Sequence, residues 1–362
     1  METRDYLWPT EDQLLLLRAA LSEREEARAA YSAWCGAVDL AGPVDHGSMG
    51  LLPLVHANLD MRSADLPHSG LIAGVRRRSF VEVQRAIGGA GEVLALLADA
   101  NIPAMVIKGV PLALGYYAHP GLRPMADADV LVERQHAERA LDTLADAGWQ
   151  SDLPDWVERR DRYLTLRHAV ELSRGAGAIV DLHWRPVHEP LPADAERRLW
   201  SCAAPITVGG AAKLRPDATS MLMHVLLHGL RRNQKAPLRW IPDALAVLAR
   251  ERTSIEWDWL VATGRRARMF NRLGLGLRFL HDNFAAAIPP EVLLQIDRSQ
   301  PSLVERLENQ LILGKRRGAI ALNSYRAAML LRLPAGSAPF VAVVDFLRRN
   351  AVRRRESTHC AR

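Results

Sequence analysis

Cysteine and long hydrophobic runs are both scarce in this chain of 362 residues. The three cysteines, Cys35, Cys202 and Cys360, are odd in number and far apart, which excludes a disulfide framework and a zinc site built from cysteine. No apolar run approaches the roughly 20 residues that a membrane-spanning helix needs. The polar start of the chain does not resemble a signal peptide. These absences predict a cytoplasmic protein without a membrane partner.

Lysine is also rare. The chain has four lysines and a large excess of arginine, and its formal net charge is +6. The end of the chain is especially basic, with Arg348, Arg349, Arg353, Arg354, Arg355 and Arg362. Such a tail can contact nucleic acid or an anionic surface, but a solvated helix end is the favoured interpretation. The charge alone therefore identifies no partner.

The hydrophobic and charged fractions, 49% and 24%, are ordinary for a globular protein, and the length suggests about two domains. Changes of periodicity and clusters of turn-forming residues divide the chain. We predict an α+β fold in which an α/β core over residues 76–210 lies between two helical parts. These are an N-terminal helical region over 1–75 and a helical C-terminal domain over 211–335, with the basic tail over 336–362.

Apolar residues at helical spacing predict two long helices before or at the start of the core. The first covers residues 10–35, and a looser stretch with several glycines and prolines follows it. The second covers residues 71–100, where Phe80, Val83 and Ile87 belong to the predicted buried stripe. Beyond residue 219 nearly all of the chain is predicted to be helical up to the basic tail.

Short apolar runs predict the strands of a small sheet in the core. They cover residues 104–107, 127–132, 163–173 and 178–184. A helix over 137–147 separates the second strand from the third, and a glycine-rich linker suited to a hairpin joins the last two.

Three acids lie on these predicted strands. Because alternate side chains of a strand share a face, Asp127 and Asp129 project together while their neighbours face the core. The same alternation places Asp181 and His183 on one face of the last strand. Two carboxylates on an otherwise apolar strand are costly to place together without a countercharge, which a divalent cation supplies.

An adjacent strand would bring Asp181 beside the first two acids. Three carboxylates gathered in this way are what a two-metal phosphoryl or nucleotidyl transfer requires, with one metal on the triphosphate and one at the attacking oxygen. We therefore predict Asp127, Asp129 and Asp181 as catalytic residues and as ligands of two Mg²⁺ ions.

A Lys-Gly pair supplies a complementary phosphate site. Lys108 and Gly109 follow a strand and precede a helix, where free N–H groups and the helix dipole favour a phosphate. Gly109 permits close backbone approach, and Lys108 offers a positive charge. Arg123, four residues before the acid pair, can hold a phosphate with its forked guanidinium. Each motif is weak alone, but their order along the chain favours a site for a nucleoside triphosphate.

The chain resembles a bacterial family of uncharacterised nucleotidyltransferases, within the DNA polymerase β-like superfamily, in the runs VIKGVPLALGYYAHPGLRPMADADVLV, IVDLHWRP, LMHVLLHGL and LRWIPDALAVL. The resemblance covers roughly residues 75–300. It implies the minimal nucleotidyltransferase core, which is a small mixed sheet with helices, followed by a helical C-terminal part.

The predicted site residues match, position by position, the residues of the family's functional motifs. Lys108 and Gly109 match its Lys-Gly turn, Arg123 its arginine, Asp127 and Asp129 its metal pair, and Asp181 its third acid. His183 belongs to an Asp-Leu-His-Trp signature and is a candidate for orienting a metal ligand. Two features depart from the superfamily: Val110 rather than glycine or serine follows Gly109, and the segment from Gly109 to Asp127 is long.

Other residues have weaker claims. His224 and His228 are four apart on a predicted helix, a possible metal spacing, but no third ligand is evident. They line the acceptor side of the site or are buried histidines, and the second alternative is favoured. For His168 two interpretations are equally favoured: it faces the nucleotide, or it is a core histidine whose ring nitrogens are hydrogen-bonded. Asp243 is predicted to be an acid in the first turn of a helix.

We predict an enzyme that transfers a nucleoside monophosphate from a triphosphate such as ATP to an unknown acceptor, with release of pyrophosphate. A small molecule or a peptide is the favoured acceptor. One alternative is a toxin-type nucleotidyltransferase that modifies tRNA, which predicts a steep salt dependence of tRNA binding. A second is a non-catalytic module that binds nucleotide without releasing pyrophosphate. A purely structural helical protein would leave the acidic cluster unexplained.

Overall fold

The structure is a computed structural model that describes residues 8–312, except 41, 62–65, 152–159, 161–162, 166, 176 and 232–237. The predicted basic tail and the predicted end of the C-terminal domain at residue 335 lie outside these residues. Within the described ranges, no helix combines the length and the apolar character that crossing a bilayer requires.

A mixed sheet forms the core of the described chain. Its seven strands are β1 (Ala104–Ile107), β2 (Ala128–Val132), β3 (Gln150–Ser151), β4 (Ala169–Arg174), β5 (Ala178–His183), β6 (Ala204–Val208) and β7 (Ala211–Arg215). They follow the order β3-β4-β5-β2-β1-β7-β6. β2 runs parallel to β5 and antiparallel to β1, while β1 runs parallel to β7. The predicted α+β fold with a small mixed sheet is confirmed.

The helices before the sheet are α1 (Glu11–Leu21), α2 (Arg24–Ala37), α3 (His46–Met49), α4 (Leu52–Asn58) and α5 (Ser69–Asp99). The helical segment predicted over 10–35 is divided into α1 and α2, because α1 ends before Ser22, whose backbone is extended. The side-chain amide of Asn58 donates to the carbonyls of Ala19 and Ser22 and so satisfies groups at the end of α1. The stretch predicted to be loose contains the short helices α3 and α4.

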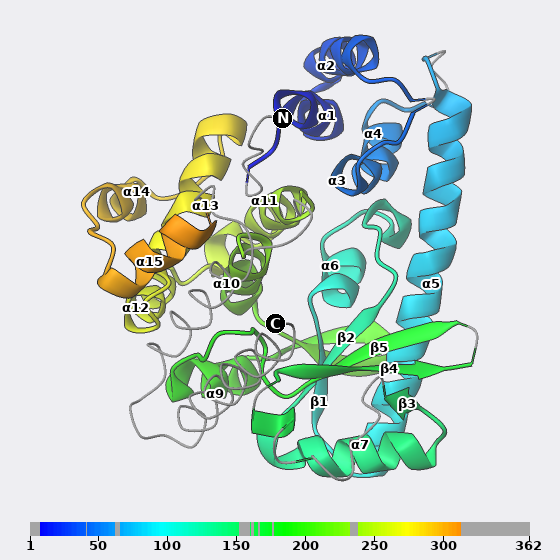
Figure 1. Ribbon diagram of the computed structural model, residues 1–362, viewed down its shortest axis with the longest axis vertical. Helices are drawn as coiled ribbons and strands as arrows, with labels where there is room; N and C mark the ends of the chain where they lie inside the picture. Colours follow the sequence, from blue (N-terminus) through cyan, green and yellow to red (C-terminus); the bar gives the residue numbers. More distant parts are fainter. Residues whose placement is uncertain are drawn as a thin grey trace, which may run out of the picture.

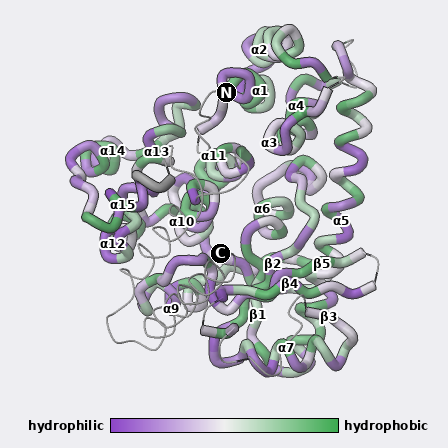
Figure 2. The backbone as a smooth tube through the Cα atoms, in the orientation of Figure 1, coloured by the Kyte–Doolittle hydropathy of each residue, from purple (hydrophilic) through white to green (hydrophobic). Residues whose placement is uncertain are grey.

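Helix α5 is the longest described element, with 31 residues, and it runs along one side of the molecule in Figure 1. Figure 2 shows hydrophobic and hydrophilic residues mixed along it, as expected for a helix with one face on a sheet. Its close packing depends on Gly89, where an added Cβ would lie 3.0 Å from the Cβ of Ala178 on β5. The prediction of a buried Phe80 is wrong, because that side chain is 41% exposed beside Gly121, beyond the sheet.

The remaining elements of the core are α6 (Gly109–Gly115), η1 (Pro120–Leu122), η2 (Arg134–His136), α7 (Ala137–Asp146) and α9 (Ala193–Ser201). The strand predicted over 163–173 begins only at Ala169, and residues 163–165 are helical instead. Strands β6 and β7 were not predicted, because their side chains are mostly half-buried or exposed and have no apolar run. Their place in the sheet depends on pairing with β1.

Alternation along the strands gives the sheet two different faces. Val106, Val130 and Val180 belong to the hydrophobic cluster to which α5 and α7 contribute. Met105 and Leu131 pack on the opposite face with α9. Because side chains two residues apart on a strand share a face, Asp129 belongs to the α9 face together with Leu131. This face is therefore apolar at one end and acidic at the other.

The helices after the sheet are α10 (Ala218–Gly229), α11 (Trp240–Arg250), η3 (Arg252–Ser254), α12 (Trp257–Arg266), α13 (Phe270–Phe284), α14 (Pro290–Asp297) and α15 (Leu303–Ile312). The helical character predicted beyond residue 219 is confirmed for the described residues. These helices share one hydrophobic cluster with the N-terminal helices, and Trp8 stacks on Phe279 with ring centroids 4.9 Å apart. The domain limits stay a prediction.

A buried arginine ties the loop after β5 to the C-terminal helices. The side chain of Arg272, on α13, is 3% exposed. Its Nη2 lies 2.6 Å from Oε1 of Glu189, and its Nη1 lies 3.5 Å from Oε1 of Glu308 on α15. Both acids are also buried. Removal of the arginine would therefore take a buried positive charge away from two buried carboxylates.

Replacing Arg272 by leucine is expected to lower the free energy of unfolding by about 3–5 kcal/mol, which urea denaturation can measure. The matched control is Arg278→Leu on the same helix, where the arginine is 30% exposed and its partners Asp282 and Asp297 are more than half exposed. The control is expected to cost less than about 1 kcal/mol. Equal losses for the two variants would contradict a stabilising role for the buried cluster.

Candidate functional site

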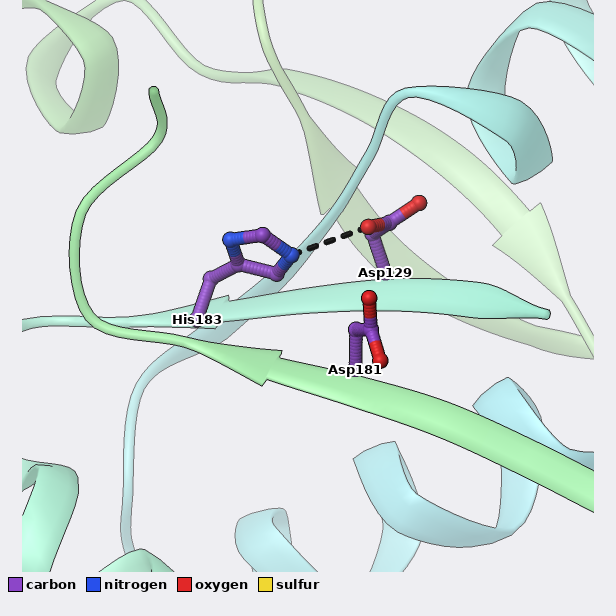
Figure 3. Close-up of side chains that lie close together, drawn as sticks. All are labelled: Asp129, Asp181 and His183. Carbon is purple, nitrogen blue, oxygen red and sulfur yellow. Dashed lines mark hydrogen bonds and ion pairs between the residues drawn. The ribbon is translucent and has the colours of Figure 1, made fainter. Parts of the chain in front are cut away.

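The register between β2 and β5 places two of the predicted acids side by side. Asp129 pairs with Asp181 across the parallel strands, as Leu131 pairs with His183 two residues further on. Figure 3 shows the side chains of Asp129, Asp181 and His183 gathered above the neighbouring strands. One carboxylate oxygen of each aspartate and one ring nitrogen of the histidine lie within 4.8 Å of one another.

His183 is fully buried and contributes an unprotonated nitrogen to this cluster. Its Nδ1 lies 3.3 Å from the carbonyl oxygen of Arg185, which can only accept a hydrogen bond, so Nδ1 is assigned as the protonated nitrogen. Its Nε2 lies 2.9 Å from Oδ1 of Asp129. Burial and the charge of Lys108 lower the pKa of His183, which keeps the ring neutral. Two electron-pair donors therefore face each other.

The ammonium of Lys108 resolves this conflict. It forms an ion pair with Asp129, and its Nζ lies 3.1 Å from Nε2 of His183. Lys108 follows β1 directly and has a φ of 53° and a ψ of −112° at the start of α6. A positive φ is uncommon for a residue other than glycine and costs backbone strain. The strained turn allows the lysine to reach the acidic face.

The pKa values of the two aspartates are shifted in opposite directions. Burial alone would raise the pKa of Asp129, but the neighbouring charge of Lys108 lowers it. Burial and the nearby charge of Asp129 raise the pKa of Asp181 to about 7, and Asp127 adds to the increase. One ammonium is therefore too little positive charge for this group of acids. A cation of higher charge would stabilise both carboxylates.

The predicted metal ligands are brought together only in part. Asp129 and Asp181 are neighbours, but Asp127 is exposed and immediately precedes β2 rather than lying on it. It is not a member of the cluster of three, although its charge acts on Asp181. The donor set of two carboxylates and one imidazole nitrogen fits a divalent cation, for which carboxylate oxygens suit Mg²⁺ and imidazole suits transition metals.

Arg123 lies beside the Lys108-Gly109 turn. A Cβ added to Gly109 would lie 2.8 Å from Nη1 of Arg123 and 2.7 Å from Sδ of Met125, so only glycine allows this approach. The Nε and Nη2 of the arginine donate to the two carboxylate oxygens of Asp243 at 3.1 and 2.9 Å. Burial lowers the pKa of Arg123, but Asp243 more than offsets this and raises it. Nη1 is the nitrogen that faces the turn.

Asp243 has a role that its sequence position did not predict. It lies in the first turn of α11 as expected, but it also accepts hydrogen bonds from Arg123 and, at 2.7 Å, from the hydroxyl of Tyr117. It is 3% exposed. The signal available in the sequence was its place inside LRWIPDALAVL, one of the runs that resemble the family. Asp243 holds the arginine at the turn.

Further histidines surround the cluster. His168 precedes β4, and its ring centroid lies 5.4 Å from that of His183 and 5.0 Å from that of His188. Burial and the nearby histidines lower the pKa of His168 to about 2, so it is neutral. His224 and His228 lie on α10, with ring centroids 6.1 Å apart. His188 was not singled out in the sequence, because nothing in its loop distinguishes it.

The fold and this cluster define an α+β protein with a buried acidic site fit for a divalent cation. The chain belongs to a family of uncharacterised nucleotidyltransferases, whose family model matches residues 48–285. The match includes every strand of the described sheet and the helices from α4 to α13. It confirms the resemblance at the level of the family. No curated protein and no solved structure matches the chain.

Proposed function

We propose that the chain is a Mg²⁺-dependent nucleotidyltransferase of the DNA polymerase β-like superfamily. It moves a nucleoside monophosphate from a triphosphate to an unknown acceptor, for which a small molecule or a peptide is favoured. The observation that carries the proposal is the pairing of Asp129 with Asp181 across β2 and β5, beside the end of β1 where Lys108 precedes α6. Family membership supports it. The scarcity of cysteine supports a cytoplasmic location, and a bacterial origin rests on the resemblance.

The carboxylates are the proposed metal ligands. Asp129 and Asp181 would hold the metal from the sheet, and Asp127 would contribute from the exposed segment before β2. When bound, Mg²⁺ neutralises charge on the triphosphate and stabilises the attacking and leaving oxygens. His183 is oriented by the hydrogen bond from its Nδ1 to the carbonyl of Arg185, and it presents Nε2 beside Asp129.

The Lys108-Gly109 turn is the proposed phosphate site. A phosphate at this turn would accept hydrogen bonds from the backbone N–H groups at the start of α6. Lys108 brings its ammonium from Asp129 to the phosphates, and Nη1 of Arg123 contributes a second positive donor. Asp243 fixes the guanidinium so that Nη1 keeps this direction.

The transfer itself needs a group that accepts a proton. The acceptor oxygen forms a bond with the α-phosphorus, the bond from that phosphorus to the pyrophosphate oxygen breaks, and pyrophosphate leaves. Asp181 takes the proton of the acceptor, because it is the half-buried carboxylate of the cluster and lies beside the place proposed for the metal. The pyrophosphate leaves beside Lys108 and Arg123.

The direct test is incubation of the purified chain with each α-labelled nucleoside triphosphate and Mg²⁺, over a metabolite extract and separately over tRNA. We expect one triphosphate to transfer its label to a small product with release of pyrophosphate, and a chelator to stop the transfer. Label on tRNA would instead favour the toxin-type alternative. Binding of nucleotide without any release of pyrophosphate would contradict the proposed activity and favour a non-catalytic module.

A further inference from the structure

The buried histidine on α10 has no structural explanation within the described chain. His224 is 4% exposed, and neither ring nitrogen has a hydrogen-bond partner among the described residues. A buried polar group without a partner costs stability, so such groups are rare in folded proteins. An unsatisfied imidazole therefore indicates a missing partner rather than a packing role.

The surroundings of His224 connect it to the candidate active site. Burial lowers its pKa to about 3, and the charges of Lys108, Asp129 and His183 also act on the ring. A neutral ring offers one N–H donor and one acceptor nitrogen. His228, one helical turn further on, is likewise under the charges of Lys108 and Asp129. Leu112 on α6, one turn after Lys108, belongs to the same hydrophobic cluster as Met223 and Val225 on α10, so α10 packs near the helix that follows Lys108 and brings two imidazoles toward the ammonium.

A second buried hydrogen-bond donor without a partner indicates that the absent partner is an acceptor. Arg231 follows α10, its charge acts on both histidines, and its buried Nε has no hydrogen-bond partner in the described part of the chain. A guanidinium can only donate, so its missing partner is an acceptor. Together with the ammonium of Lys108, these groups form a neutral and cationic surface suited to the oxygens of an anion.

We propose that His224 is a further residue of the substrate site, where its N–H donates a hydrogen bond to an oxygen of the triphosphate chain held by Lys108. This inference rests on the proposed function and deepens it, because it assigns α10 to the phosphate side of the site. His228 and Arg231 extend the same surface. A neutral donor suits this place, because it binds the anion without adding repulsion to the cations already present.

The proposal predicts that stability and binding change in opposite directions. In His224→Leu the full chain is expected to unfold at a higher urea concentration than the parent, because an unsatisfied buried group is removed. The same variant is expected to bind inorganic tripolyphosphate with Mg²⁺ about 10-fold more weakly in calorimetry, the loss of one hydrogen bond to a charged group. Tripolyphosphate is the probe because it does not depend on the preferred base.

Two further variants complete the experiment. His224→Gln keeps an N–H donor and is expected to recover part of the affinity. His281→Leu, on α13, removes a ring whose Nδ1 lies 3.3 Å from the carbonyl of Ala286, so it should lower the unfolding midpoint and leave tripolyphosphate binding unchanged. A His224→Leu variant that binds tripolyphosphate as the parent does, or a parent that does not bind it, would overturn the inference.

The outcome is separable from that of the proposed function. Normal release of pyrophosphate by the parent, with unchanged tripolyphosphate affinity in His224→Leu, would sink the inference and leave the nucleotidyltransferase activity standing. Weaker tripolyphosphate binding by His224→Leu, with no release of pyrophosphate by the parent, would support the role of His224 in phosphate binding and contradict the proposed nucleotidyltransferase activity.

Discussion

Replacing Asp127 and Asp129 together by asparagine is expected to lower the rate of nucleotidyl transfer by about 1000-fold or more. Asparagine keeps the shape of each side chain but removes two negative charges from the proposed metal site. The charge stabilisation that a bound metal supplies is worth several kcal/mol, and each 1.36 kcal/mol is about a factor of ten in rate. The measurement is pyrophosphate release with the triphosphate that the parent uses.

The matched control replaces two exposed aspartates elsewhere. Asp146, at the end of α7, and Asp258, in the first turn of α12, are both exposed. Asp146→Asn with Asp258→Asn makes the same change in net charge and is expected to leave the rate within about twofold. If the Asp127 and Asp129 double variant is folded and turns over as fast as the parent, the assigned metal site is wrong.

Replacing Lys108 by methionine is expected to change metal binding and turnover in opposite directions. Without the ammonium, Oδ1 of Asp129 and Nε2 of His183 lose the cation that they share. We expect the nucleotide-free chain to bind Mn²⁺ at least about 10-fold more tightly, because a competing buried charge is gone. Transfer is expected to fall about 100-fold, since the triphosphate loses its proposed lysine contact.

Titration of free Mn²⁺ by electron paramagnetic resonance measures the first effect, and pyrophosphate release measures the second. Lys213→Met is the matched control, because Lys213 is another of the four lysines and its Nζ lies 3.4 Å from the carbonyl of Leu94, away from the acids. The control is expected to change neither quantity appreciably. An Mn²⁺ affinity that stays the same or falls in Lys108→Met would show that the lysine does not occupy the cation's place.

The pairing of the two acids could be predicted from the sequence because it depends on local rules. Asp129 and Asp181 lie in short apolar runs, and strand alternation puts each of them on the face opposite its apolar neighbours. The prediction that an adjacent strand would bring them together is confirmed by the pairing of β2 with β5. The position of Lys108 at a strand-to-helix turn is confirmed for the same reason.

Other predictions failed where distant parts of the chain decide the outcome. Periodicity continued through residue 22, but Asn58 from α4 satisfies the carbonyls at the end of α1 and the helix stops there. Phe80 fits the apolar stripe of α5, yet at that point the helix passes η1 rather than the sheet, and the ring stays 41% exposed. β6 and β7 lack an apolar run and depend on the edge that β1 offers.

The sequence by itself indicated a small α/β core, the two acids on its strands and the Lys-Gly turn, because periods of two and 3.6 residues and turn chemistry are local properties. The mixed sheet was implied by the resemblance to the family. Only the tertiary structure decided that Lys108 contacts both Asp129 and His183, that Asp243 holds Arg123, and that His224 on α10 is buried without a hydrogen-bond partner among the described residues. Those contacts join residues far apart in the chain, and their energies depend on burial and on neighbouring charges. Neither quantity is encoded in the spacing of residue types along the chain.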